Sequence, residues 1–154
     1  MADKHLITVN PENLSQFTHL HECIFPLKFP KKFYREAVNP TKPGIHHIAA
    51  FNDKYVGVLS ACVIKEANDD LHLYIYSLGC KVLHRKRGIG TFMLHNCIEF
   101  ANNQNCKKVK LHVQQINEDA KEFYKKNGFC EVCIEQNYYK RLEKPDAIVM
   151  CKEL

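Results

Sequence analysis

The residues best suited to chemistry form a basic, glycine-containing segment, Arg85-Lys86-Arg87-Gly88-Ile89-Gly90, with Lys81 shortly before it. The segment lies between a predicted strand and a predicted helix. Glycines at a helix N-terminus allow backbone N–H groups to approach an anion, and the helix dipole favours negative charge there. The segment therefore predicts a pyrophosphate site, although a plain glycine turn beside solvated basic side chains would have the same sequence.

Two common phosphate-binding patterns do not describe this segment. The chain lacks the pattern G-x4-G-K-[ST]. The third glycine of a dinucleotide-binding fingerprint would fall at Met93, and the strands before the segment look antiparallel. The predicted anion site is therefore of another type.

Two side chains are candidates for proton transfer. His112 alternates with apolar residues along its predicted strand and lies on the polar face, where a base is useful. Tyr74 is predicted to share one face of its strand with Tyr76 and Leu78. A hydrogen-bonded histidine and a core tyrosine are the structural alternatives for these two positions.

These residues need strands and helices to position them, and hydrophobic periodicity predicts both. Predicted strands cover 5–9, 45–51, 54–65, 71–78, 107–114, 129–135 and 147–151. Predicted helices start at Asn10-Pro11-Glu12, cover 31–38, follow the glycine segment, and run from an Asn117 cap to a stop at Gly128. The order predicts a mixed α/β fold, with an antiparallel meander before a strand–helix–strand–helix–strand unit.

Length and composition limit the classes of protein. The 154 residues fit one domain, 1–154, and the charged and hydrophobic fractions are those of a globular chain. The net charge of +5 suits a small anion as well as nucleic acid. No apolar run is long enough to span a membrane, and we expect no secretion signal at the N-terminus.

The eight cysteines are expected to be reduced residues of a cytosolic or nuclear protein. Cys130 and Cys133 form one C-x2-C pair, but no second pair of ligands lies nearby. In a regular strand, residues three apart point to opposite faces, so the two sulfurs are not expected to converge. No metal site is predicted.

The order of several segments resembles the GNAT acetyltransferase family. The glycine segment follows a strand, and an Asn-x-x-Ala-x-x-Phe-Tyr pattern, 117–124, comes further along the chain. Other segments resemble its San subfamily, the N-alpha-acetyltransferases that are catalytic subunits of NatE. They are Phe25-Pro26, Lys32-Phe33-Tyr34, Phe51-Asn52-Asp53, Leu73-Tyr74-Ile75, Leu111-His112-Val113-Gln114 and Asn137-Tyr138-Tyr139-Lys140-Arg141. The resemblance runs from about Ile7 to the last residue.

This resemblance implies a GNAT fold and acetyl-CoA as cosubstrate, with no metal. In such folds a twisted mixed sheet splays between two parallel central strands, flanking helices cover it, and acetyl-CoA lies in the splay. By the resemblance, the cofactor contacts fall on Leu78, Gly79, Cys80, Arg85, Lys86, Arg87, Gly88, Ile89, Gly90, Thr91, Asn117 and Tyr124. Tyr124 is also a candidate proton donor to the leaving sulfur.

The resemblance further implies acetyl transfer to the N-terminal amines of proteins, with Tyr74 and His112 acting as bases through ordered water. An α-amino group has a pKa near 7.7–8.0, against about 10.4 for lysine, so it loses its proton more easily. Residues implied to bind the peptide are Phe25, Pro26, Leu27, Phe29, Tyr76, Tyr138 and Tyr139. An apolar wall of this kind fits a substrate that begins with Met and a hydrophobic residue, with weaker activity expected on lysine.

Departures from the San pattern bear on substrate preference. Five positions carry residues that differ from the usual ones: Leu27, Lys28, Phe29, Cys62 and Tyr76. We expect acetyl transfer to survive these changes, and the preference at the second and later residues of the peptide to differ.

The resemblance also implies association with the NatA complex and the ribosome, in the cytoplasm and the nucleus, without direct binding of nucleic acid or membrane. Three alternatives stay open. They are a catalytically weak paralog that serves as a docking subunit of NatA, a GNAT enzyme for lysines or small amines, and a nucleic-acid module. The last of these would interleave basic and aromatic residues on one face, whereas the basic residues here cluster at one predicted helix start.

Overall fold

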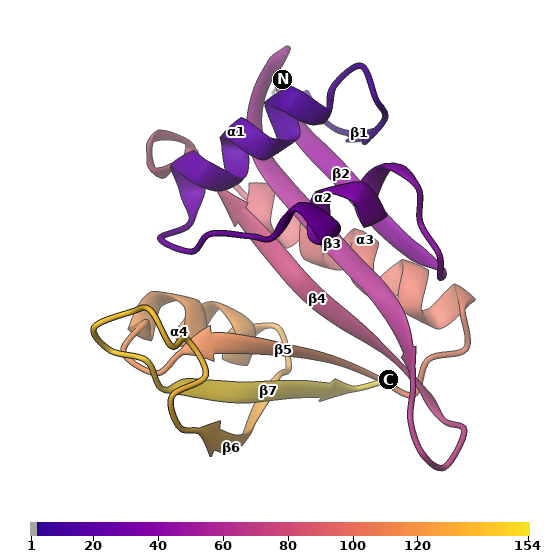
Figure 1. Ribbon diagram of the computed structural model, residues 1–154, viewed down its shortest axis with the longest axis vertical. Coiled ribbons are helices and arrows are strands. Elements are labelled where there is room, and N and C mark those ends of the chain that lie inside the picture. The colour runs from indigo at the N-terminus through magenta and orange to yellow at the C-terminus, as the bar shows by residue number, and fades with distance from the viewer. Residues whose placement is uncertain (1–2) are drawn as a thin grey trace.

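Seven strands form one sheet in the computed structural model, which describes residues 3–154, and helices cover both of its faces (Figure 1). The strands are β1 Lys4–Thr8, β2 Gly44–Phe51, β3 Lys54–Lys65, β4 Leu71–Cys80, β5 Lys108–Gln114, β6 Cys130–Glu135 and β7 Ala147–Glu153. The helices are α1 Leu14–Ile24, α2 Lys31–Val38, α3 Ile89–Asn103 and α4 Glu118–Lys126, with a short 3-10 helix at Val82–His84. The predicted mixed α/β fold is confirmed.

The largest error in a predicted boundary lies at the start of the first helix. The first helix begins at Leu14 and not at Asn10-Pro11-Glu12. The Asn10 side chain accepts hydrogen bonds from the backbone N–H groups of Glu12 and Asn13, at 2.9 and 3.0 Å. These bonds hold a turn, because an asparagine that bonds its own backbone competes with helix formation.

The strand order is β1-β2-β3-β4-β5-β7-β6, and only β4 and β5 run parallel among these neighbours. Their pairing covers four register positions, His72 to Ile75 against Lys108 to Leu111. Beyond this point the two strands separate, and β5, β7, β6 and α4 diverge from the rest of the sheet (Figure 1). We call this point the fork.

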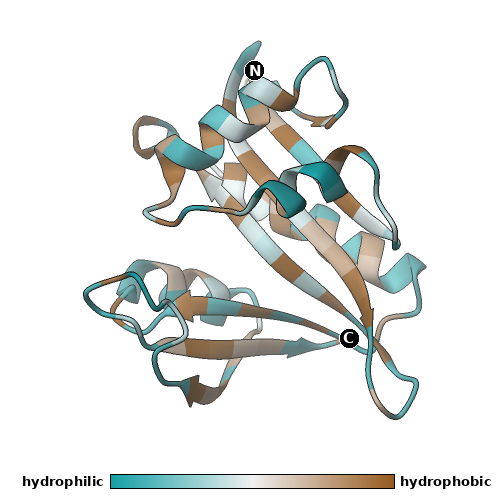
Figure 2. Cartoon of the chain, in the orientation of Figure 1, coloured by the Kyte–Doolittle hydropathy of each residue, from teal (hydrophilic) through white to brown (hydrophobic). Residues whose placement is uncertain are grey.

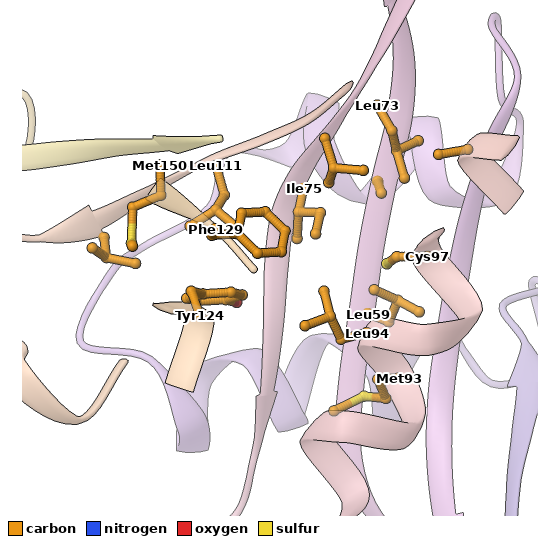
Figure 3. Close-up of a cluster of buried hydrophobic side chains, with 14 of the residues drawn as sticks. Leu59, Leu73, Ile75, Met93, Leu94, Cys97, Leu111, Tyr124, Phe129 and Met150 are labelled. Atoms are coloured by element: carbon orange, nitrogen blue, oxygen red, sulfur yellow. The ribbon is translucent and has the colours of Figure 1, made fainter. Parts of the chain in front are cut away.

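Two apolar cores hold the layers together. The larger lies between one sheet face and helices α3 and α4, and includes Leu94, Leu111 and Tyr124 (Figure 3). The smaller lies under α1 and α2 and includes Phe17 and Val58. Apolar residues accordingly mark the strands, and hydrophilic ones mark the loops and the outer helix faces (Figure 2). The cores fix the positions of α3 and of the fork.

Two β-bulges change which face particular side chains occupy. On β4 the register shifts around Tyr76, because Ile75 pairs with Ala61 and Ser77 with Ser60. Tyr74 and Tyr76 remain neighbours, whereas Leu78 pairs with Leu59 and packs in the larger core. The prediction that Leu78 shares a face with Tyr74 is therefore wrong, since a bulged residue breaks the alternation.

The second bulge lies on β6. Cys130 pairs with Cys151 and Cys133 with Val149, so Val132 is the extra residue between them. Because Cys151 and Val149 are two apart on β7, Cys130 and Cys133 share a face, contrary to the prediction. All eight cysteines are free thiols, and no group of metal-binding side chains occurs within residues 3–154.

Candidate active site

Within residues 3–154, no side chain caps the start of α3. Its N-cap residue is Gly88, in the left-handed region at φ 80°, with no side-chain hydrogen bond and no acid in the first turn. The first N–H groups of a helix have no partner within the helix, so this end presents free donors and a positive dipole. Arg85 and Lys86, both exposed, precede it. The arrangement is suited to binding a phosphate.

The predicted cations around this helix start do not all lie in the same surroundings. The Arg85 Nε–H points to the carbonyl of Cys80, at 3.5 Å. The Arg87 guanidinium lies 5.6 Å from the centre of the Phe51 ring, at the end of β2. Ile89 is buried in the larger core, so only its backbone is available to a ligand. Gly90 and Thr91 form the rest of the first turn.

Tyr74 and His112 meet at the fork. The Tyr74 hydroxyl lies 2.5 Å from His112 Nδ1, in a hydrogen bond from β4 to the first residue of β5 beyond the paired positions. Burial, reinforced by the bond to Tyr138, raises the pKa of the Tyr74 hydroxyl. The Tyr74 hydroxyl therefore keeps its proton and can donate a hydrogen bond to His112 Nδ1. The structure brings together the two predicted catalytic residues.

The loop after β6 closes around this pair. The Tyr138 ring stacks on His112, with 3.9 Å between ring centres and 5° between the planes. The Tyr138 hydroxyl lies 3.3 Å from that of Tyr74. Tyr139 packs edge-on against Tyr138, and burial raises the pKa of its hydroxyl. Both predicted peptide-binding tyrosines thus adjoin the fork.

The apolar loop between α1 and α2 faces the same region through a chain of aromatic rings. Phe29 lies 4.6 Å from Phe33, Phe33 lies 6.3 Å from Tyr76, and Tyr76 lies 4.8 Å from Tyr74, measured between ring centres. Phe25 packs against Phe29 at 5.8 Å. These predicted residues form a wall that leads to the fork; Pro26 is exposed and Leu27 is half-buried in the same loop.

A buried histidine supports this wall. His21 bonds the Phe17 carbonyl through Nδ1 and the Ser77 hydroxyl through Nε2, both at 2.8 Å. Burial lowers the pKa of His21 to about 4, partly opposed by the backbone bond to Phe17. The ring is therefore neutral near pH 7, and it ties α1 to β4 next to Tyr76. Sequence patterns did not identify it.

Two of the residues predicted to line the cofactor arm, Gly79 and Cys80, lie at the end of β4. Beyond Ile75, β4 is paired only with β3, so the edge that carries Gly79 and Cys80 faces the opening of the fork. At Gly79 a Cβ would lie 2.9 Å from Ile24 and 3.0 Å from Phe25. A larger residue here would require the Ile24 or Phe25 side chain to shift.

Asn117 and Tyr124 both take structural roles. The Asn117 side chain caps α4 by accepting the Ala120 N–H at 3.1 Å. The Tyr124 ring packs against Phe123 and Phe129, and burial raises the pKa of its hydroxyl. Neither role excludes contact with a ligand in the fork.

Several further residues adjoin the site without having been predicted. A Cβ at Gly90 would lie 3.3 Å from the Phe123 ring, and one at Gly88 would lie 3.3 Å from Lys4 Nζ. Glu135 Oε1 lies 3.2 Å from His112 Nε2. Lys4 and Glu135 carry no local sequence signal, because strand pairing places them there.

The fold and the site fit acetyl-CoA. Free donors and cations at α3 suit its phosphates, and the free edge of β4 offers backbone groups to its amide-containing arm. Its thioester would then lie at the fork. Across residues 3–154 no helix is long and apolar enough to cross a membrane.

Comparison with known proteins agrees with this geometry. Residues 14–129 match the model of the acetyltransferase (GNAT) family. The chain is 37% identical to N-alpha-acetyltransferase 50 of Danio rerio, over 95% of this chain and 86% of that protein. It is 38% identical to the probable N-acetyltransferase san of Drosophila melanogaster, over 95% and 78%.

A solved structure extends the agreement to the whole fold. Arabidopsis thaliana Naa50, in complex with the bisubstrate analogue CoA-Ac-MVNAL, superposes with a TM-score of 0.89 at 33% identity. The match covers 98% of this chain and 99% of the other. The splayed sheet, the open helix start at the fork and these likenesses lead to one conclusion, that the chain belongs to the GNAT acetyltransferase family.

Proposed function

We propose that this protein transfers the acetyl group of acetyl-CoA to the N-terminal amine of proteins. The observation that carries the proposal is the Tyr74–His112 hydrogen bond at the fork, between the open start of α3 and two aromatic walls. The relatives named above as N-alpha-acetyltransferases, and the analogue bound to the Arabidopsis protein, support the same activity.

The two residues at the fork would accept the proton of the amine. Acetyl-CoA supplies a thioester carbon, which the amine nitrogen attacks as the carbon–sulfur bond breaks and its electron pair stays on sulfur. The amine proton passes to the Tyr74 oxygen, while the Tyr74 proton passes to His112 Nδ1. Tyr138 lies 3.3 Å from the Tyr74 hydroxyl and holds the pair in place.

An α-amine suits this machinery better than a lysine amine. Its pKa near 7.7–8.0 leaves an appreciable neutral fraction at pH 7, whereas lysine, near 10.4, is almost wholly protonated. We expect weaker acetylation of lysine for this reason.

The walls favour peptides that begin with Met and a hydrophobic residue. Phe25, Phe29 and Tyr76 present apolar rings on one side, and Tyr138 and Tyr139 on the other. The analogue bound to the Arabidopsis relative carries the peptide MVNAL, which has this pattern. The departures at Leu27, Lys28, Phe29, Cys62 and Tyr76 are expected to alter the preference at the second and later positions.

We further propose that the protein acts as a NatE-type catalytic subunit, in the cytoplasm and the nucleus, and associates with NatA and the ribosome. The San-type segments from Phe25 to Arg141 support this assignment. Sedimentation of the tagged protein with ribosomes, in cells with and without NatA, tests it. Sedimentation that is independent of NatA contradicts it.

A peptide panel tests the activity. Acetyl transfer is measured on peptides that begin with Met and differ at residue two, each with a free or a blocked N-terminus and an internal lysine. We expect the free Met-hydrophobic peptides to react fastest. Equal rates on blocked peptides would exclude the N-terminal preference, and no transfer to any peptide would favour a docking role.

His112→Ala and Tyr74→Phe test the assigned bases. Each is expected to lower kcat about 100-fold, since a positioned acid or base contributes on the order of 100- to 10,000-fold. The KM for acetyl-CoA is expected to stay near its original value. Full activity in either variant contradicts the assignment.

A further inference from the structure

A carboxylate stands on the outer side of the His112 ring. His112 has two ring nitrogens, and Tyr74 occupies Nδ1. Glu135 Oε1 lies 3.2 Å from the other nitrogen, Nε2. The Nε2 atom is buried, and within residues 3–154 it makes no hydrogen bond. When Nδ1 accepts the Tyr74 hydrogen bond, Nε2 is the ring nitrogen that carries the proton.

The β6 bulge is what places Glu135 on this side of the sheet. Glu135 pairs with Ala147, and Ala147 pairs with Gln114 of β5. Gln114 is two residues from His112, so Glu135 and His112 share a face, with β7 between them. Without the extra residue Val132, the alternation from Cys130 would turn Glu135 to the opposite face. Bulges next to active sites often redirect a side chain in this way.

We propose that Glu135 is a positioning residue that fixes the tautomer of His112 and stabilises its charged form during acetyl transfer. The proposal deepens the proposed function and rests on it. When His112 Nδ1 receives the Tyr74 proton, the ring becomes an imidazolium whose Nε2–H faces the Glu135 carboxylate. The side chain of Glu135 is 47% exposed, so the proton can leave from this end of the site to solvent.

The remaining groups around His112 leave this carboxylate as the nearest anion. Tyr74 approaches from β4, and Tyr138 stacks on the ring from the loop after β6. Lys110 lies on the same strand and face as His112. Its Nζ forms an ion pair with Glu66 Oε1 at 3.6 Å, and this pair compensates the Lys110 charge. Cys151 of β7 stands opposite Lys110.

Glu135→Gln tests the proposal, because glutamine keeps the size of the side chain and removes the charge. We expect kcat on the best Met-hydrophobic peptide to fall about tenfold, less than for a fully buried partner because Glu135 is half exposed. The KM values for acetyl-CoA and peptide should stay within about twofold. Glu131→Gln is the matched control, since Glu131 lies on the other face of β6, 2.8 Å from Lys125, and should leave kcat unchanged.

A double variant separates positioning from a general structural effect. In a His112→Ala background, Glu135→Gln should cause no further loss.

Several results would overturn the proposal. They are an unchanged kcat, an additive loss in the His112→Ala background, or a change limited to the KM of peptides with basic side chains, which would make Glu135 a substrate contact. The wild-type protein is measured in parallel, so a failure of N-terminal acetylation itself is seen separately.

Discussion

Helices α3 and α4 each follow one of the two parallel strands at the fork, but their first turns differ. α4 is capped by Asn117, whose side chain accepts the Ala120 N–H, and it carries Glu118 and Asp119, whose charges suit its dipole. α3 begins at Gly88 with neither cap nor acid, after Arg85 and Lys86. One helix start is partly satisfied by its own side chains, and the other is left open, as a site for the phosphates of acetyl-CoA requires.

The largest effect is expected when the cations before α3 are reversed. Arg85→Glu combined with Lys86→Glu should raise the KM for acetyl-CoA at least about 100-fold, since two charge-assisted hydrogen bonds at about 1.5 kcal/mol or more are lost. The control is Lys107→Glu with Lys126→Glu, which has the same change in net charge at exposed positions. Similar KM values for the two double variants would mean that α3 is not the phosphate site.

Exchanging the first-turn charge should reverse the difference between the helices. Thr91→Glu gives α3 an acid, which should stabilise the ligand-free protein by about 0.5 kcal/mol and raise the KM for acetyl-CoA about tenfold. Asp119→Asn removes an acid from α4, and should cost about 0.5 kcal/mol with no change in KM. Urea unfolding and steady-state kinetics measure both. A KM that rises equally in the two variants contradicts the comparison.

The two left-handed glycines allow a comparison at equal backbone strain. Gly88 begins α3 at φ 80°, and Gly128 follows α4 at φ 89°. Alanine at either position should cost about 1 kcal/mol of unfolding free energy, because a Cβ disfavours this region, and at Gly128 the Cβ must also displace Lys152 Nζ. Only Gly88→Ala should also raise the KM for acetyl-CoA, by about threefold, since its Cβ would enter the anion site. An unchanged KM for Gly88→Ala would place the phosphates elsewhere.

The smallest effect is expected at Asn117, where capping and ligand contact coincide. Asn117→Ala should cost about 1 kcal/mol of stability through loss of the cap. Asn117→Asp keeps an oxygen that can accept the Ala120 N–H, so stability should be kept while the amide donor is lost. A KM raised about twofold in Asn117→Asp would agree with the predicted cofactor contact, given the modest net value of one hydrogen bond. No change would leave Asn117 as a cap alone.

The elements were predictable because each has a periodicity of its own and clear end signals. α4 shows this well, with Asn117 before it, acids in its first turn and Gly128 after it. The Arg85–Gly90 segment and the polar position of His112 were likewise visible along the chain.

The bulges at Tyr76 and Val132 were not predictable. A bulge is one unpaired residue, and its position depends on the partner strand, which sequence periodicity does not report. The errors follow directly: Leu78 was placed with Tyr74, and Cys133 was separated from Cys130. Glu135 was overlooked for the same reason, since its approach to His112 needs the Val132 bulge.

The free edge of β4 beyond Ile75 also bears on the amount of this protein in a cell. A cosubstrate that binds there and at α3 binds the folded chain and not the unfolded one. Each tenfold rise in its free concentration above Kd adds about 1.4 kcal/mol to folding stability. A cell short of acetyl-CoA would hold more of the chain unfolded and lose it to proteases. The quantity of enzyme, and not only its rate, would then follow the metabolic supply.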